Sequence, residues 1–229
     1  MAKKKEEEQV TTAPVEEAVE SAVADAPVEE ETVAEDLVAK EIKACLLKTK
    51  REGIKDLVEY MEDSGFFTAP ASGGNHSNQV GGLAAHSLNV LHMAKRMSVA
   101  FYGGKNISAD LRNSIVIAAL LHDLGKIGDY DKQMYVPNIL KSGKQSEAKP
   151  WMRNKQLSNV PHSVRSVKLA TLFIDLTEDE EWAILAHDGL YDFMKYEIMG
   201  HETELYMLIH FADLWSSKVL ESAGEGGEE

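Results

Sequence analysis

Six histidine and aspartate residues are placed so that their side chains could bind metal ions. His122 and Asp123 are adjacent and end an apolar run that begins at Ile115. A buried His–Asp pair is costly to remove from water unless a ligand compensates for the lost hydration. Neutral imidazole and carboxylate both bind first-row divalent metals well. The other four candidates of these residue types are His86, His162, His187 and Asp213.

The apolar pattern places the candidates on separate predicted helices or at their ends. These helices are predicted at residues 83–102, 108–123, 161–174, 177–187 and 202–220, and two earlier ones lie between residues 36 and 64. Ser108 is a good N-cap, Pro161 suits a first helical position, and Thr177 with Glu180 forms a capping box. Metal sites in helical bundles have this layout, with ligands projecting inward from facing helices.

Residues 130–157 lack a helical period and predict a small β-hairpin that could serve as a flap. Residues 130–139 give a weak strand signal, residues 141–144 resemble a turn, and residues 151–157 would form the returning strand. The predicted fold class is therefore an all-α helical bundle with one small hairpin.

The charge of the chain is distributed unevenly. The formal charge is −14, but residues 1–36 hold twelve acidic residues against three lysines, and residues 221–229 hold four glutamates and no base. We expect a disordered acidic leader at 1–36, a helical domain at 37–220, and a disordered acidic tail at 221–229. The domain itself is close to neutral, so the low pI does not argue against an anionic substrate.

Composition excludes several classes of protein. A single cysteine, Cys45, rules out a disulfide framework and a cysteine-based zinc site. No apolar run approaches the roughly 20 residues that span a bilayer, and the first residues lack the apolar segment of a signal peptide. No basic stripe indicates a nucleic-acid surface. The sequence therefore predicts a cytoplasmic protein without a membrane partner.

The order of the candidates resembles that in the HD-domain metal-dependent phosphohydrolases. Their motif is a single His, an adjacent His-Asp and a distant Asp on separate helices. Here the matching stretches are G-G-L-A-A-H-S-L around His86, L-L-H-D-L-G-K around His122–Asp123, and H-F-A-D-L-W around Asp213. Members with two metals add two histidines, which His162 and His187 resemble.

Within that family, the motifs are most similar to the HD domain of bacterial 3′→5′ exoribonucleases and to small dinuclear-metal HD nucleotide hydrolases. The chain departs from the exonucleases in two ways. It shows no N-terminal β-barrel module, and it reads His187-Asp188 where those enzymes often carry two histidines. Both departures weaken the expectation of a nucleic-acid substrate.

The resemblance implies a site with divalent metal ions, two of them, with Asp123 bridging both. His86, His122 and Asp213 would complete the first ion, and His162 and His187 the second. The nitrogen and oxygen ligands suit manganese, iron, cobalt or zinc without choosing among them. Lys126 would assist catalysis by meeting a phosphate oxygen. Further substrate contacts are predicted for His76, Arg153 and Arg165.

Each candidate also has a structural interpretation that requires no metal. The His122–Asp123 pair and His86 could be satisfied core residues, and Asp213 could form a salt bridge. His162 and His187 could cap helix ends, and Lys126 could favour a helix C-terminus through the helix dipole. The remaining three, His76, Arg153 and Arg165, could be ordinary loop or solvated residues.

The predicted function is a metal-dependent phosphohydrolase that acts on a nucleotide or related phosphoester through metal-activated water. Phosphorylated small molecules or nucleotides are the expected partners, with single-stranded nucleic acid as a further one. Three alternatives stay open: a 3′→5′ exonuclease or cyclic-dinucleotide phosphodiesterase, a diiron HD-type oxygenase, and a non-enzymatic regulatory HD module. The sequence does not indicate the oligomeric state.

Overall fold

The computed structural model describes residues 26–75, 77–104, 106–189 and 194–222. The chain divides into two compact units, Met1–Leu37 and Val38–Glu229. Helix α2 (Ala26–Lys48) begins eleven residues before the predicted start of the domain at residue 37, so residues 26–36 are helical where disorder was predicted. Alanine and glutamate, which dominate that stretch, both favour helix over coil. The remainder of the predicted leader lies outside the described residues.

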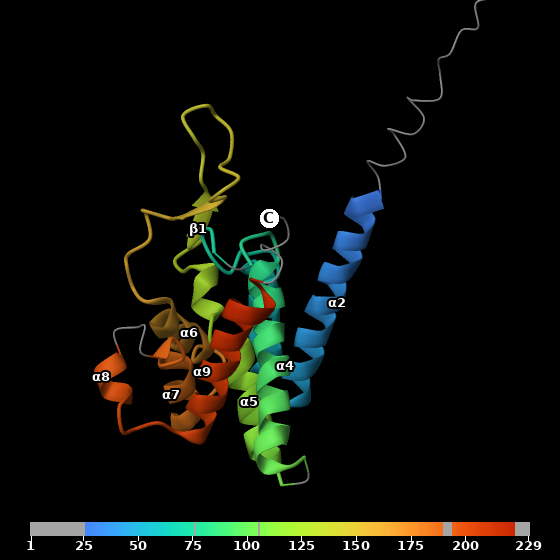
Figure 1. The fold of residues 1–229 in the computed structure, drawn as a ribbon, viewed down its shortest axis with the longest axis vertical. Coiled ribbons are helices and arrows are strands. Elements are labelled where there is room, and N and C mark those ends of the chain that lie inside the picture. Colours follow the sequence, from blue (N-terminus) through green and yellow to red (C-terminus); the bar gives the residue numbers. More distant parts are fainter. Residues whose placement is uncertain (1–25, 76, 105, 190–193, 223–229) are drawn as a thin grey trace, which may run out of the picture. The chain divides into compact units, whose positions relative to one another are not determined.

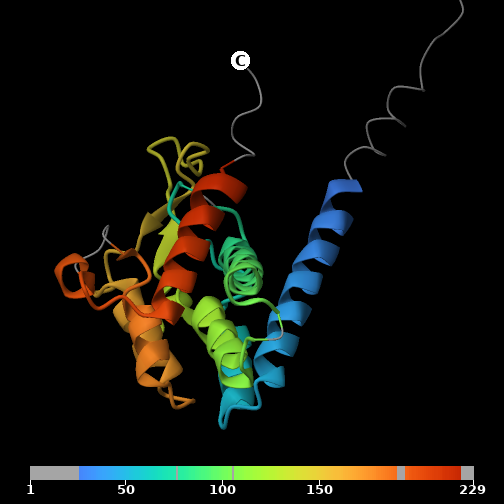
Figure 2. The same cartoon turned by 60° about the horizontal axis from the view of Figure 1, so that its bottom comes forward.

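The second unit is a helical bundle, which confirms the predicted fold class (Figures 1 and 2). Its central helix α5 (Ala109–Leu121) has seven consecutive buried residues, 115–121, and packs against α4, α7 and α9. A helix that is apolar on all sides must lie in the core, because no face of it suits water. No described helix is long and apolar enough to cross a membrane. The other helical elements are α3 (Ile54–Asp63), α4 (Gly82–Tyr102), η1 (Leu124–Ile127), α6 (His162–Ala170), α7 (Glu178–Leu185), α8 (Lys195–Ile198), α9 (Glu204–Trp215) and η3 (Ser216–Leu220).

Side-chain caps fix where two of these helices begin. Ser108 Oγ accepts a hydrogen bond from the Leu111 amide at 3.1 Å, which caps α5. Thr177 and Glu180 form the predicted capping box at the start of α7. Such caps satisfy backbone amides that have no partner inside the helix. They therefore set the register in which the far ends of α5 and α7 present their side chains.

The predicted hairpin is present but shorter than expected. Strand β1 (Tyr135–Pro137) pairs antiparallel with β2 (Trp151–Arg153), and Tyr135 lies opposite Arg153. Trp151 Nε1 donates to the Asn78 carbonyl at 2.5 Å, and the Trp151 amide donates to the Gly73 carbonyl at 3.2 Å. These bonds hold the hairpin against the loop that leads into α4.

Candidate metal centre

The structure brings all six candidate residues together in one site inside the helical bundle. Four of them, His86, His122, Asp123 and His187, are at most 1% exposed. The six are supplied by the start of α4 (His86), the end of α5 (His122 and Asp123), the start of α6 (His162), the end of α7 (His187) and α9 (Asp213). Helix termini are well suited to this, because a polar side chain there disturbs little packing.

Asp123 lies at the centre, with one carboxylate oxygen toward each half of the site. Its Oδ2 is 3.3 Å from Nε2 of His122 and 3.6 Å from Nε2 of His86. Its Oδ1 is 3.1 Å from Nε2 of His162 and 3.5 Å from Nε2 of His187. Asp213 joins the first half, with Oδ1 3.1 Å from Nε2 of His86. One carboxylate facing two groups of donors is the arrangement of a ligand shared between two ions.

Backbone carbonyls fix the orientation of two of the histidine rings. Nδ1 of His122 donates to the Ala119 carbonyl, and Nδ1 of His187 donates to the Ile184 carbonyl, each at 2.8 Å. A carbonyl can only accept, so Nδ1 carries the proton in both rings. In the neutral ring Nε2 then carries the lone pair and points into the site. Metal-binding histidines are oriented in this way by the hydrogen bond of the other ring nitrogen.

Two features of the site are explained by a bound cation. Nε2 of His162 lies 3.1 Å from Nε2 of His187, and Nε2 of His122 lies 3.4 Å from Nε2 of His86. Two lone pairs at this distance repel each other unless a proton or a metal ion lies between them. In addition, the buried Oδ1 of Asp123 makes no hydrogen bond with a described residue. The donor set therefore fits divalent metal ions, as three overlapping groups of three residues within 4.8 Å also indicate.

Comparison with known protein families agrees with this geometry. The family model of the HD domain matches residues 83–213, from the start of α4 to the last candidate ligand. The chain belongs to the HD domain family. No curated protein and no solved structure matches the chain. Most HD domains are metal-dependent hydrolases, so membership of the family supports an enzyme that uses divalent metal.

Two further acidic groups that were not predicted as site residues lie at the metal centre. Asp188 Oδ2 is 3.3 Å from Nε2 of His162, and its Oδ1 is 3.7 Å from Nε2 of His187. Asp188 thus adds oxygen donors to the half of the site that holds only one other carboxylate oxygen. Asp188 follows His187 directly in the sequence. This position beside a candidate ligand is the feature of the sequence from which its role could have been predicted.

The second acidic group is Glu221, which the sequence assigned to a disordered tail. That assignment is wrong for Glu221, because its Oε1 lies 2.9 Å from Nδ1 of His86. Ser77 Oγ donates to Oε2 at 2.7 Å, and Asn89 Nδ2 donates to Oε1 at 3.1 Å. The carboxylate is therefore held by three side chains that are distant in sequence, one from the loop before α4 and two from α4 itself. The other tail residues of 223–229 lie outside the described part of the chain.

We predict that Glu221→Gln weakens metal binding about 10–100-fold. Glu221 accepts the Nδ1 proton of His86 and so directs the Nε2 lone pair into the site; an amide can donate instead and favour the other tautomer. Isothermal titration of the metal-free protein with Mn²⁺ measures the change. Glu225→Gln, in the same acidic segment, is the control. Equal affinities for the two variants would contradict a role of Glu221 in orienting His86.

The predicted substrate-binding residues differ in their position relative to the metal centre. Lys126 Nζ is 2.6 Å from Asp123 Oδ2 and remains 12% exposed, so it lies at the site. Arg153 lies opposite Tyr135 in the hairpin. Burial raises the pKa of the Tyr135 hydroxyl, the charge of Lys126 lowers it, and the charge of Asp123 raises it. This places the base of the hairpin beside the metal centre.

Arg165 is not brought into the site. It is 2% exposed, and its guanidinium donates to Asp129 at 3.2 Å and to the Ser158 carbonyl at 2.8 Å. These contacts tie α6 to the segment after η1, so the predicted phosphate contact is not supported. His76, the remaining predicted substrate contact, lies outside the described residues.

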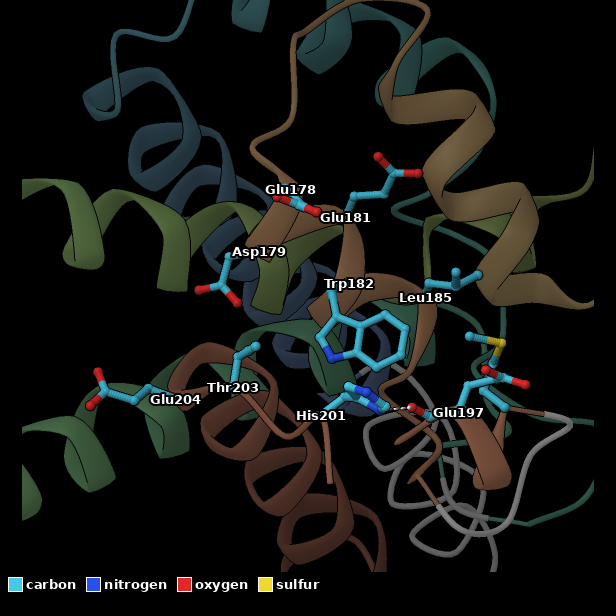
Figure 3. A pocket seen from close by; sticks show the side chains of 10 residues that line it. Glu178, Asp179, Glu181, Trp182, Leu185, Glu197, His201, Thr203 and Glu204 are labelled. Atoms are coloured by element: carbon cyan, nitrogen blue, oxygen red, sulfur yellow. Dashed lines mark hydrogen bonds between the residues drawn. The ribbon is translucent and has the colours of Figure 1, made fainter. Parts of the chain in front are cut away.

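A cavity of about 870 Å³ lies away from the metal centre, between α7 and the start of α9 (Figure 3). Trp182 and His201 line it together with Glu178, Glu181 and Glu197, whereas none of the six candidate ligands does. His201 Nδ1 forms a hydrogen bond with the Glu197 carbonyl at 3.0 Å. The acidic lining and the separate position make this cavity unsuited to a phosphate substrate.

Protons and metal ions should compete for the histidines. Burial lowers the pKa of His86, but hydrogen bonds to Asp213 and Glu221 outweigh it and raise the pKa to about 10. Burial also lowers the pKa of His187, and Asp188 and Asp123 outweigh it and raise the pKa to about 9. For Asp123, burial opposes ionisation, yet Lys126 and His122 hold its pKa well below the usual range. Without metal, His86 and His187 therefore carry an additional proton at the positions where metal ions would bind.

We accordingly predict that metal affinity rises as the pH increases from 6 to 9. A histidine with a raised pKa holds its proton at pH 7, and a metal ion must displace that proton to bind. Binding should therefore release protons, and the required displacement diminishes as the pH approaches 9. Titration calorimetry in buffers of different ionisation enthalpy measures the number released. An affinity that is the same at pH 6 and pH 9 would contradict the prediction.

Proposed function

We propose that this HD domain hydrolyses the phosphoester bond of a nucleotide or related small molecule with the help of two divalent metal ions. The observation that carries the proposal is the position of Asp123, with one oxygen toward each group of histidines. His86, His122 and Asp213 would hold one ion, and His162, His187 and Asp188 the other. Divalent ions bound there supply an activated water near neutral pH and neutralise charge on the phosphoryl oxygens.

The residues around the metal centre provide what a phosphate substrate requires. Burial opposes the charge of Lys126, but its ion pair with Asp123 raises the pKa of the ammonium, so the group keeps its proton at neutral pH. A fixed positive charge at this position favours a phosphate oxygen and the charge that develops during hydrolysis. Tyr135 lies on the hairpin close enough to Lys126 and Asp123 for their charges to shift the pKa of its hydroxyl, which is a hydrogen-bond donor. Arg153 lies opposite Tyr135 in the hairpin, and its guanidinium donates to the Val160 carbonyl at 3.1 Å.

A small substrate is favoured over a long strand by the surroundings of the site. The hairpin is tied to the loop before α4 through Trp151 and Asn78, and its residue Tyr135 lies near Lys126. The motifs around His86 and Asp123 are similar to those of small HD nucleotide hydrolases.

A substrate panel tests the proposal. The purified protein, loaded separately with Mn²⁺, Co²⁺, Fe²⁺ and Zn²⁺, is incubated with nucleoside monophosphates, cyclic and linear dinucleotides, and short single strands. Release of phosphate from monophosphates supports the proposal; cleavage of dinucleotides or strands alone supports the phosphodiesterase or exonuclease alternative. Oxygen consumption by the iron-loaded protein without phosphate release would favour the oxygenase. Full metal loading with no turnover would favour the regulatory module.

A further inference from the structure

Helix α9 carries a row of large apolar side chains on the face opposite the metal centre. Met207, Phe211 and Trp215 follow one another at four-residue spacing and therefore lie on one side of the helix. They are 37%, 43% and 52% exposed. Asp213, two residues from both Phe211 and Trp215, points the other way and contacts His86. Exposed apolar rows of this size mark interaction surfaces in many proteins.

Two hollows flank Phe211 and extend the apolar surface onto α4. One, of about 440 Å³, is lined by Met93 and Met97 of α4 together with Trp215. The other, of about 280 Å³, is lined by Phe101 of α4 together with Met207. Phe211 lines both hollows, and Phe101 is 68% exposed. Each hollow is thus a recess beside a protruding aromatic side chain.

The charged residues of this surface are found at its two ends and have opposite signs. Glu204 lies three residues before Met207, and Lys218 lies three residues after Trp215. Both are exposed. The order Glu, Met, Phe, Trp, Lys is therefore symmetric in spacing about Phe211. A partner with one sign of charge would suit one end of this surface and oppose the other.

We propose that this surface binds a second copy of the same chain, with the two α9 helices antiparallel and a two-fold axis passing beside Phe211. In such an isologous contact each residue pair occurs twice. Glu204 and Lys218 are each seven residues from Phe211; Glu204 begins α9, whereas Lys218 lies in the π-helical turn η3 that continues it. Each charge therefore lies on the order of 10 Å from Phe211 along the helix axis. The two-fold axis therefore sets Glu204 against Lys218 of the second copy, at both ends.

The same symmetry matches the hollows. Trp215 of one copy meets the hollow beside Met207 and Phe101 of the other, and the arrangement is repeated across the axis. Interfaces of this type are centred on aromatic side chains in recesses, with charged residues at the rim. The charges select the antiparallel orientation, because a parallel pairing would set Glu204 against Glu204 and Lys218 against Lys218.

Charge reversal tests the orientation. Sedimentation equilibrium of the full chain should give twice the monomer mass of 25.3 kDa at high concentration. Glu204→Lys and Lys218→Glu should each raise the dissociation constant about tenfold or more, because each creates two like-charge pairs. The double variant should restore the wild-type constant. Asp110→Lys, on exposed α5 surface, is the control for altered net charge and should leave the constant unchanged.

Cross-linking tests the position of the axis. With Cys45→Ser as the background, Phe211→Cys should form an intermolecular disulfide between two copies of the same residue under mild oxidation. Leu172→Cys replaces a residue that is 64% exposed and lines neither hollow, and should not cross-link comparably. Circular dichroism and Mn²⁺ binding verify that each variant is folded.

Three outcomes would overturn the proposal. The first is a monomer at all concentrations, including one that captures a different protein through this surface. The second is a double charge variant that dimerises no better than the single variants. The third is a disulfide at Leu172 that forms as fast as the one at Phe211.

Discussion

Replacing Asp123 with asparagine should abolish binding of both metal ions and reduce hydrolysis to background. The carboxylate is the group that faces both halves of the site, through Oδ2 and Oδ1. An amide has one oxygen and cannot bind two cations as a carboxylate does. Loss of an outer partner of a metal ligand costs about 10–100-fold in affinity, so loss of a shared ligand should cost more than about 100-fold.

The same substitution should destabilise the metal-free protein by about 3 kcal/mol, because Lys126 loses the carboxylate that compensates its buried charge. Chemical denaturation measures this change, and metal analysis with calorimetry measures binding.

Asp213→Asn is the informative comparison, since it removes a ligand from one half of the site and should leave one ion bound. Asp110→Asn, an exposed substitution at the start of α5, controls for loss of a carboxylate elsewhere. Retention of two ions by the Asp123 variant would exclude it as the bridging group.

The order of the candidate ligands was predictable because each is tied to a local signal. His122 and Asp123 follow an apolar helix, and His187 follows a helix whose capping box was legible in the sequence. The family motif then related residues that are more than a hundred positions apart. The hairpin was predictable in position, since its strand signals flank a turn, but its strands proved to be only three residues each.

Contacts made across the fold could not be predicted in the same way. Glu221 lies in an acidic, glycine-rich stretch that is typical of disorder, yet Ser77, His86 and Asn89 all bind its carboxylate. Nothing near Glu221 in the sequence indicates these partners. Arg165 shows the opposite case: three residues after His162, it looked suited to phosphate, but Asp129 occupies its guanidinium. In both cases a side chain distant in sequence decides the role.

The start of α2 was misplaced for a different reason. Composition indicated disorder for residues 1–36, whereas the helix begins at Ala26. Alanine and glutamate are common both in disordered segments and in helices, so composition alone does not separate the two. A helix that continues from a packed segment also avoids the cost of nucleation, which favours extension beyond the apolar part of the pattern.

Substituting Gly125 with alanine should remove one ion selectively and destabilise the fold. A methyl group at Gly125 would lie 2.1 Å from the His162 carbonyl and 2.8 Å from the Ser166 amide nitrogen, both backbone atoms of α6. The Gly125 amide also donates to Ser166 Oγ at 2.8 Å. Helix α6 would have to move away from η1, and overpacking of this kind costs about 1–3 kcal/mol.

The shift of α6 would carry His162 away from Asp123 and His187, so the half of the site that includes His162 should lose its ion. His86, His122 and Asp213 do not lie on α6 and should retain theirs. Metal analysis should therefore give one ion for Gly125→Ala and two for Gly104→Ala, where a methyl group meets only Val99 at 4.0 Å. His162→Ala should also lose one ion but without the packing strain, and thereby separate the loss of the ligand from the destabilisation of the fold. Two ions in Gly125→Ala would show that α6 can yield without moving His162, and that the close approach of η1 to α6 does not position this ligand.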